Sequence, residues 1–214
     1  MGGCDFPMQL NWLDQPTPIL LSSGFPENMV LLDCETTGGK ATYHRIIEIG
    51  LLIIENGALI EKWQTFIDPK VPLPPFIQRL TGISPGMLNG APEFSQIAEE
   101  LLSKLKGRTL VAHNARFDYS FLKNEFERVG MSYNNKPLCS VKFSRNLYPQ
   151  FKRHGLSQII ERFGLSIENR HRSLDDAEML SAIRGVSDEF DNLRWGVSIY
   201  NLEFAEKALK IPDC

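Results

Sequence analysis

The chain has 214 residues and 43% apolar content, which suits one sizeable soluble domain with a hydrophobic core. Its formal net charge of -3 gives no overall attraction to nucleic acid, so any such binding must come from a local basic surface. The 4 cysteines form no C-x-x-C pair, no signal-peptide pattern opens the chain, and no apolar run is long enough to span a bilayer, so we expect a reducing, cytoplasmic location without membrane contact.

The first part of the chain predicts an irregular lead-in followed by three strands. Residues 1–27 are rich in proline and polar residues and show little periodicity. The apolar runs at 29–35 and 46–54 indicate buried strands, and residues 58–67 alternate well enough to form a third. Asn56-Gly57 is typical of a type I′ turn, so the second and third strands should form an antiparallel hairpin.

Helical and strand patterns then alternate. In order, they predict a helical turn at 76–80, a helix from Ser84-Pro85 to Gly107, a strand at 109–112, a helix from 113 to Gly130, a strand at 138–141, and helices at 157–163 and 173–186. Residues 187–214 are interpreted as a linker or C-terminal extension. This order implies an α/β domain over residues 28–186, in which helices flank a mixed sheet that a hairpin begins and parallel crossovers complete.

Two carboxylates, Asp33 and Glu35, stand at the end of the first predicted strand. Side chains alternate along a strand, so both acids should point to one face and Cys34 to the other. The alternative is a surface loop with two solvated acids, but the apolar run before them places the pair at the edge of the core. Like charges there are costly without a cation, and carboxylate oxygens suit Mg²⁺ or Mn²⁺.

Two further acids lie in the first turns of predicted helices. Asp118 follows the strand that ends at Ala112, and an acid there also stabilises the helix dipole. Asp176 is alternatively the partner of Ser173 in a capping box, and His171 is alternatively an ordinary loop histidine. These structural roles leave unexplained why two separate helix starts carry acids alongside the Asp-x-Glu strand.

Three segments together resemble the three exonuclease motifs of the DEDDh 3′–5′ exonucleases, a family that includes the proofreading epsilon subunit of bacterial DNA polymerase III. They are Leu32-Asp33-Cys34-Glu35-Thr36-Thr37-Gly38, His113-Asn114-Ala115-Arg116-Phe117-Asp118 and His171-Arg172-Ser173-Leu174-Asp175-Asp176-Ala177. Residues 75–83 and 154–157 also resemble family segments, and the resemblance covers residues 28–186. Similar exonuclease modules occur fused to a GIY-YIG nuclease module, and residues 153–156 resemble a stretch of those exonuclease modules. Three ordered motifs at family spacing are far more specific than any one of them.

The resemblance implies a ribonuclease H-like fold with a mixed five-stranded sheet. It implies that two Mg²⁺ or Mn²⁺ ions are held by four acids, which are Asp33, Glu35, Asp118 and Asp176. His171 is then the general base that deprotonates a water molecule. The tyrosine branch of this superfamily carries tyrosine where this chain has Arg172, so the histidine branch fits better. The site should lie at the C-terminal ends of the parallel strands.

Candidate contacts to the substrate come from the same motifs. They are Thr36, Thr37, Thr81, His113 and Asn114. Alternatively, the first two are turn residues and the last two a satisfied polar pair, and Thr81 departs from the epsilon pattern, which has histidine before Gly-Ile. Positive charge also gathers near the third motif, as a track for a phosphate backbone or alternatively as a solvated face. Its residues are Lys142, Arg145, Lys152, Arg153, Arg170 and Arg172.

The predicted function is a metal-dependent 3′–5′ exonuclease that releases nucleoside 5′-monophosphates from single-stranded DNA 3′ ends in proofreading or repair. A polymerase or a fused nuclease module is the expected partner. One alternative is a 3′–5′ exoribonuclease of the same fold, because recognition of the 2′-OH depends on the shape of the pocket. Another is a catalytically inactive nucleic-acid-binding module, against which the presence of all four acids and His171 argues.

Overall fold

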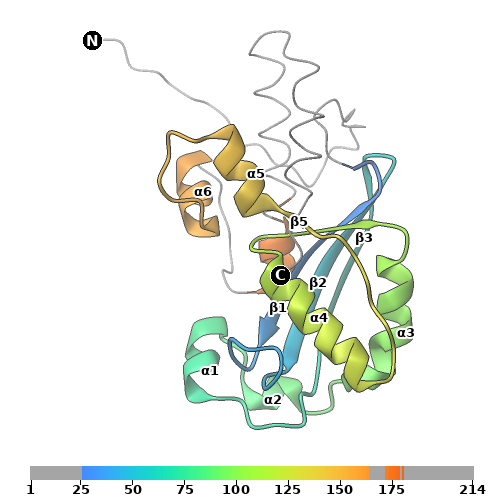
Figure 1. The fold of residues 1–214 in the computed structure, drawn as a ribbon. Coiled ribbons are helices and arrows are strands. Elements are labelled where there is room, and N and C mark those ends of the chain that lie inside the picture. The colour runs from blue at the N-terminus through green and yellow to red at the C-terminus, as the bar shows by residue number, and fades with distance from the viewer. Residues whose placement is uncertain (1–25, 164–171, 179, 181–214) are drawn as a thin grey trace.

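A mixed five-stranded sheet forms the centre of the domain (Figure 1). The computed structural model describes residues 26–163, 172–178 and 180. The strands are β1 (Met29–Thr36), β2 (Ile46–Glu55), β3 (Ala58–Phe66), β4 (Thr109–Ala112) and β5 (Leu138–Cys139). They lie in the order β3-β2-β1-β4-β5. β2 is antiparallel to both of its neighbours, and β4 is parallel to both of its own, which confirms a sheet begun by a hairpin and completed by parallel crossovers.

Helices surround this sheet. They are α1 (Pro75–Thr81), α2 (Pro85–Leu88), α3 (Phe94–Leu105), α4 (Arg116–Arg128), α5 (Ser140–Leu147) and α6 (Leu156–Phe163), and residues 173–178 are also helical. In Figure 1, α3 and α4 lie to the right, α1 and α2 below, and α5 and α6 at the upper left. Within the described residues, no helix combines the length and the apolar character that crossing a bilayer requires.

Alternation along β1 divides the core in two. Val30 and Leu32 point into a cluster that α3 and α4 complete. Met29 and Leu31 point into a second cluster, which α6 and Ala177 complete from the other face. Because both faces of β1 are covered, the strand is apolar at every position before its acids.

The face of the sheet that holds Met29 and Leu31 turns from apolar to acidic toward the C-terminal end of β1. On this face the β1–β2 register pairs Met29 with Ile54 and Leu31 with Leu52, but it then pairs Asp33 with Gly50 and Glu35 with Glu48. Residues paired across antiparallel strands point to the same side of the sheet. One continuous face therefore packs against α6 at one end and presents three carboxylates and a glycine at the other.

The helix expected over residues 84–107 is in fact two helices, α2 and α3, with a break between them. Pro92 lies in this break, and proline disfavours helical geometry at the residue before it. The Glu93 N–H then donates to Gln96 Oε1 at 2.7 Å, so that α3 starts anew with its own cap.

The strand expected over residues 138–141 is shorter than predicted. β5 has 2 residues, and Ser140 already begins α5, a helix that the sequence patterns did not indicate. Ser140 is buried, its hydroxyl donates to Ala112 O at 3.4 Å, and the same oxygen lies 2.8 Å from His113 Nδ1. These contacts with the end of β4 fix where the chain turns from strand to helix.

The remaining element predictions are confirmed where the structure describes them. The helical turn, the helix of the second motif and the short helix before the third motif are α1, α4 and α6. Asn56 and Gly57 have φ values of 49° and 77°, the positive angles that a type I′ turn requires. The helix expected over 173–186 is described only as far as residue 180, while residues 1–25 and 187–214 lie outside the described residues.

Candidate metal centre

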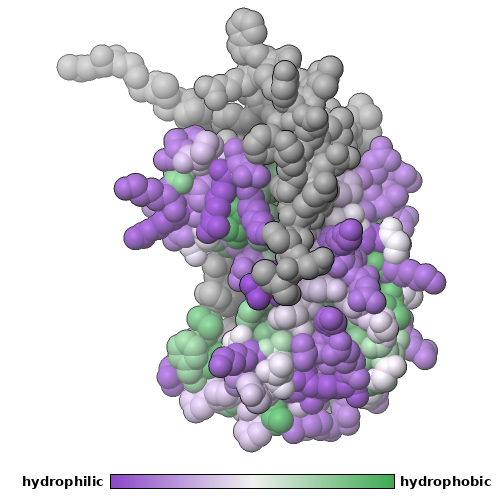
Figure 2. Space-filling view, in the orientation of Figure 1, coloured by the Kyte–Doolittle hydropathy of each residue, from purple (hydrophilic) through white to green (hydrophobic). Residues whose placement is uncertain are grey.

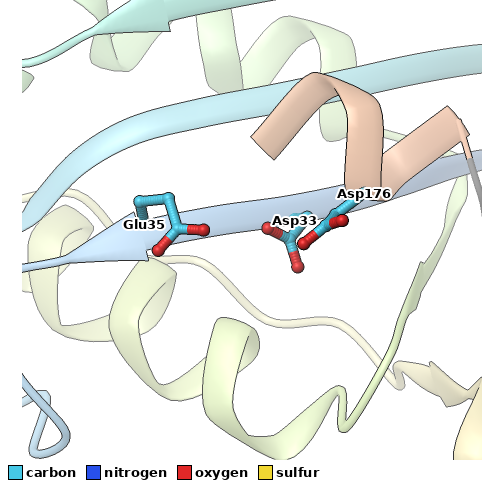
Figure 3. A group of neighbouring side chains, drawn as sticks. All are labelled: Asp33, Glu35 and Asp176. Carbon is cyan, nitrogen blue, oxygen red and sulfur yellow. The ribbon is translucent and has the colours of Figure 1, made fainter. Parts of the chain in front are cut away.

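Three carboxylates converge at the C-terminal end of β1 (Figure 3). Asp33 and Glu35 project from β1, and Asp176 projects from the helix at 173–178. Each offers one ligand oxygen, and these oxygens all lie within 4.8 Å of one another. Asp176 is buried, and the two strand acids are half-buried. An all-oxygen donor set at this spacing fits a hard divalent ion such as Mg²⁺ or Mn²⁺.

Asp176 reaches the strand acids because the start of its helix lies directly on β2. A Cβ added to Gly50 would lie 2.3 Å from the backbone nitrogen of Leu174, so only glycine leaves room for that backbone. Ala177 then packs the helix into the apolar cluster on the same face of the sheet. Since Gly50 pairs with Asp33, the helix delivers Asp176 to the side of Asp33, as Figure 3 shows.

A fourth acid, Glu48, lies on the same face of the sheet as Asp33 and Glu35 and is fully buried. The three sequence motifs do not include it. Its Oε1 accepts hydrogen bonds from Arg172 Nη2 and Gln64 Nε2, both at 2.8 Å. Its Oε2 accepts one from the Ser173 N–H at 3.1 Å. The Asp176 N–H donates to Arg172 O at 2.9 Å. The N–H groups of Ser173 and Asp176, which a capping box would use, therefore have other partners. Glu48 caps the helix instead.

Asp118 is not among the three acids whose ligand oxygens lie within 4.8 Å of one another. It is buried in the first turn of α4, and its Oδ1 accepts hydrogen bonds from the N–H and the thiol of Cys34, both at 3.3 Å. Because Cys34 stands between Asp33 and Glu35 but faces the other way, Asp118 meets β1 at the level of the acids from the α4 side. Burial raises the pKa of Asp118 to about 7 and, together with the nearby Asp118 charge, raises that of the Cys34 thiol well above its usual value. The role of Asp118 as a metal ligand remains a prediction.

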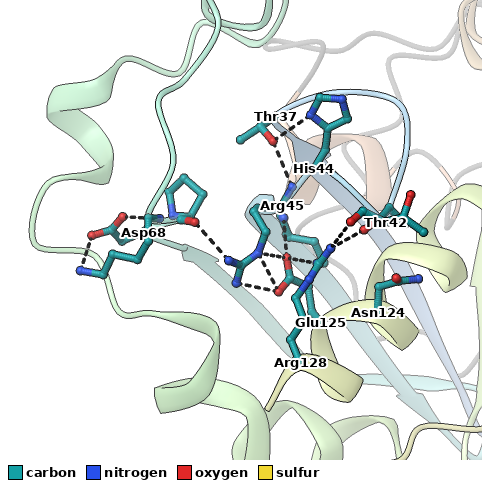
Figure 4. Close-up of polar contacts among 12 residues, drawn as sticks. Thr37, Thr42, His44, Arg45, Asp68, Asn124, Glu125 and Arg128 are labelled. Carbon is teal, nitrogen blue, oxygen red and sulfur yellow. Dashed lines mark hydrogen bonds and ion pairs between the residues drawn. The ribbon is translucent and has the colours of Figure 1, made fainter. Parts of the chain in front are cut away.

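Thr36, the last residue of β1, and Thr37, which follows it, both use their hydroxyl groups within the β1–β2 loop. Thr36 Oγ1 donates to Gly38 O at 2.9 Å. Thr37 Oγ1 accepts from the Arg45 N–H at 3.0 Å and lies 3.4 Å from His44 Nδ1 (Figure 4). Both threonines are buried, and their contact with a substrate remains a prediction.

Glu125 of α4 holds this loop in place (Figure 4). Arg45 donates to the Glu125 carboxylate through Nε at 2.8 Å and through Nη2 at 2.9 Å, and the Ile46 N–H donates to it at 3.2 Å. Arg128 Nη1 lies 3.2 Å from the same carboxylate, while its Nη2 donates to Ala41 O at 2.6 Å. The exit of β1 is thus tied to α4 at several points.

The other predicted substrate contacts lie in different surroundings. Thr81 is buried, and its hydroxyl donates to Ile77 O at 2.9 Å and accepts from the Ile83 N–H at 3.1 Å, which closes the end of α1. His113 contacts the start of α5. Asn114 adopts a φ of 69° in the turn before α4. Their role in substrate binding remains a prediction.

Basic side chains gather over α5 and α6, where Figure 2 shows hydrophilic groups that protrude from the surface. The exposed basic residues there are Lys142, Arg145, Lys152 and Arg153. Arg172, which was expected in the same group, instead binds Glu48. Arg170 and the predicted base His171 lie outside the described residues.

The exonuclease family model RNase_T matches residues 30–183, and the chain belongs to this exonuclease family. The resemblance to DEDDh exonucleases that the three motifs indicated is thereby confirmed. The family depends on divalent metal ions, which agrees with the acidic group at the end of β1.

Curated relatives of the chain are PolC-type DNA polymerases III. The relative from Clostridium perfringens is 35% identical over 173 residues, which are 79% of this chain and 12% of that protein. The relative from Streptococcus thermophilus is 36% identical over 181 residues, which are 81% of this chain and 12% of that protein. The chain therefore spans about 12% of the length of these relatives.

Solved structures with the same fold are also exonucleases. The zinc-bound complex of Escherichia coli ExoI with ssDNA has a TM-score of 0.69 at 17% identity, covering 78% of this chain and 42% of that one. Exonuclease X in complex with 5′ overhanging duplex DNA has a TM-score of 0.62 at 19% identity, covering 83% and 99%. A 3′-exonuclease that recognises the histone mRNA stem-loop has a TM-score of 0.67 at 19% identity, covering 78% and 66%. These neighbours confirm the ribonuclease H-like fold.

Proposed function

We propose that this chain is a two-metal-dependent 3′–5′ exonuclease that releases nucleoside 5′-monophosphates from DNA 3′ ends. The observation that carries the proposal is the convergence of Asp33, Glu35 and Asp176, whose ligand oxygens lie within 4.8 Å of one another. This convergence occurs at the end of a central strand in a chain of the exonuclease family.

The three acids, together with Asp118, hold two Mg²⁺ or Mn²⁺ ions in this proposal. Ions bound there would supply the positive charge that offsets the phosphate charge, lowers the pKa of a water molecule and stabilises the leaving oxygen. Cations beside Asp118 would favour its charged form and so offset the effect of burial on its pKa. An imidazole nitrogen of His171 accepts the proton of the attacking water, the general-base role that histidine takes most often in enzymes.

Single-stranded DNA is the proposed substrate. The curated relatives are DNA polymerases, and the ExoI neighbour is in complex with ssDNA. The exposed basic residues over α5 and α6 offer a track for the phosphate backbone. RNA is the second candidate, because the neighbour that recognises a histone mRNA stem-loop shares the fold.

A proofreading or repair role beside a polymerase completes the proposal, since the relatives that match this chain are polymerases of much greater length. The polymerase is either joined to the exonuclease or a separate partner, and a fused nuclease module is the other candidate. Cys34 and Cys139 are free thiols, which suits a reducing cytoplasm.

Digestion of labelled DNA and RNA oligonucleotides with free or blocked 3′ ends tests the proposal. With Mn²⁺, the wild type should release mononucleotides from free DNA 3′ ends, and a chelator or Asp33→Asn should stop the reaction. Equal degradation of 3′-blocked strands contradicts the direction of digestion, and faster cleavage of RNA selects the exoribonuclease. No cleavage of either polymer by folded wild type selects the inactive binding module.

A further inference from the structure

We propose that Glu48 is a positioning residue for the metal centre: it holds the start of the helix at 173–178 so that Asp176 meets Asp33 and Glu35. Gly50 is the second part of this device, because it provides the space in which that helix rests. The inference rests on the proposed function, because it assigns a task to residues around the same site.

Every described group that contacts the Glu48 carboxylate is an N–H donor. Arg172 donates through Nε at 3.1 Å and Nη2 at 2.8 Å to Oε1, and it also lies 3.3 Å from Oε2 through Nε. Gln64 and the Ser173 N–H provide the remaining donors. A carboxylate surrounded in this way is fixed in one orientation, because an ionised carboxylate accepts at both oxygens and donates at neither.

Apart from Gln64, the residues that donate to Glu48 are two consecutive residues of the chain, Arg172 and Ser173. The Asp176 N–H donates to Arg172 O at 2.9 Å, which closes the first turn of the helix. A short series of hydrogen bonds thus runs from the β2 side chain through Arg172 to the backbone of the residue that carries the third carboxylate. A change in the orientation of Glu48 would shift this turn and, with it, the Asp176 carboxylate.

The sheet register makes this geometry specific. Glu48 stands opposite Glu35, and Gly50 stands opposite Asp33. A Cβ at Gly50 would lie 2.4 Å from the carbonyl carbon of Ser173, so the helix start lies as close to β2 as a glycine allows. Glu48 therefore holds the helix along the strand, and Gly50 sets its distance from the sheet.

Glu125 provides a matched control for a purely structural role of Glu48. Both are buried glutamates that bind an arginine through its Nε and Nη2 atoms, and both accept a hydrogen bond from a backbone N–H. Glu125, however, ties the β1–β2 loop to α4 and has no bond to the helix at 173–178 among the described residues. If Glu48 only stabilised the fold, the two glutamates would be equivalent with respect to metal binding.

Mn²⁺ binding measured by isothermal titration calorimetry or electron paramagnetic resonance separates these roles. Glu48→Gln keeps the size of the side chain but places a donor among donors, and we expect about 10–100-fold weaker Mn²⁺ binding. Glu125→Gln should lose melting temperature similarly and keep its Mn²⁺ affinity within about twofold, because Glu125 has no bond to the helix at 173–178 among the described residues. Glu48→Gln that binds like the wild type, or equal losses in both variants, overturns the inference.

Measurements on the wild type and on Arg172→Lys distinguish failure of this inference from failure of the proposed function or of folding. Wild type that binds Mn²⁺, with Glu48→Gln unchanged, removes the positioning role alone, whereas folded wild type that binds no Mn²⁺ removes the proposed function and this inference together. If Glu48→Gln does not fold, Arg172→Lys replaces it, because lysine keeps the charge but loses the forked contact. Arg172→Lys should also weaken Mn²⁺ binding, and unchanged affinity in that variant overturns the inference.

Discussion

The pairs Glu48–Arg172 and Glu125–Arg45 are the same chemical unit placed on two sides of one sheet. The glutamate side chains are 0% and 1% exposed, and the arginine side chains are 30% and 26% exposed. Hydrogen bonds to these glutamates raise the pKa of Arg172 and of Arg45 above the usual value for arginine. In each pair a partly exposed guanidinium therefore neutralises a carboxylate that the sheet has buried.

The two pairs differ in what they join. Glu125 connects α4 to the loop that follows β1, and it contacts a second cation, Arg128. Glu48 connects β2 to a helix start 124 residues later in the chain. Buried ion pairs contribute little net stability compared with apolar side chains of similar size, so their value lies in the geometry that they specify. Here one pair ties the β1–β2 loop to α4, and the other holds the helix that carries the third acid.

The largest loss of activity is expected when the carboxylate of Asp176, which the Glu48 pair positions, is removed. Asp176→Asn should lower the exonuclease rate by about 10³-fold, or about 4 kcal/mol of transition-state stabilisation, and should abolish most of the rise in melting temperature with Mn²⁺. Asp175→Asn is the neighbouring control and should retain both. A rate for Asp176→Asn within tenfold of the wild type would remove Asp176 from the metal centre.

Replacing Arg172 or Arg45 with alanine tests whether Arg128, the second cation beside Glu125, compensates for a lost arginine. Arg172→Ala leaves Glu48 buried without a cation among its described partners, and it should cost about 3–5 kcal/mol of unfolding free energy. Arg45→Ala leaves Glu125 with Arg128 and should cost about half as much. Urea denaturation in the presence of a chelator measures both, and equal losses would show that Arg128 does not compensate.

Asp118 differs from the two glutamates, because its described partners are the N–H and thiol of Cys34 and include no cation. Its pKa is raised from 3.8 to about 7, so between these values the folded protein keeps a proton that the unfolded chain has released. Its contribution to stability is complete below about pH 4 and is lost as the pH rises to about 7, by up to about 1.4 kcal/mol per pH unit.

Denaturation of the metal-free protein across this pH range checks the Asp118 prediction. Asp118→Asn should remove most of the slope, since its amide does not titrate. An unchanged slope in this variant would assign the pH dependence to other groups.

Alanine substitutions at two glycines, Gly50 and Gly39, should have smaller and unequal effects on stability. Gly50→Ala should destabilise the protein by about 1–3 kcal/mol, because the added methyl group would meet the backbone at Ser173 and Leu174. Gly39→Ala in the β1–β2 loop meets nothing within 4 Å and should change stability by less than about 1 kcal/mol. Thermal melts of both variants provide the measurement, and a neutral Gly50→Ala would mean that the helix can move away from β2.

Local patterns were sufficient for the strands and for the pair of acids on β1. Alternation places Asp33 and Glu35 on one face, and the unbroken apolar run before them reflects burial on both sides of the sheet. The break between α2 and α3 and the start of α5 were mispredicted because they depend on Pro92 and on contacts of Ser140 with the end of β4. The latter contacts join residues that are distant in sequence, which no local pattern contains.

The Glu48 pair was missed for a related reason, although the sequence held a signal. A single glutamate in the otherwise apolar run at 46–54 is an isolated buried charge that requires a cation, and Gly50 follows it on the same face. The cation, Arg172, is far along the chain and could be assigned only from the fold. The position of Asp118 relative to the other three acids likewise depends on how α4 lies against β1.

The distance along the chain between Glu48 and Arg172 has a consequence during protein synthesis. The strands that carry Asp33, Glu35 and Glu48 leave the ribosome first, and at about 5–20 residues per second the partner 124 residues later follows after about 6–25 s. Until then the nascent chain carries Asp33, Glu35 and Glu48 without the arginine that neutralises Glu48. The centre is therefore completed only near the end of translation of this domain, so that a partly made chain lacks the third acid that the proposed nuclease activity requires.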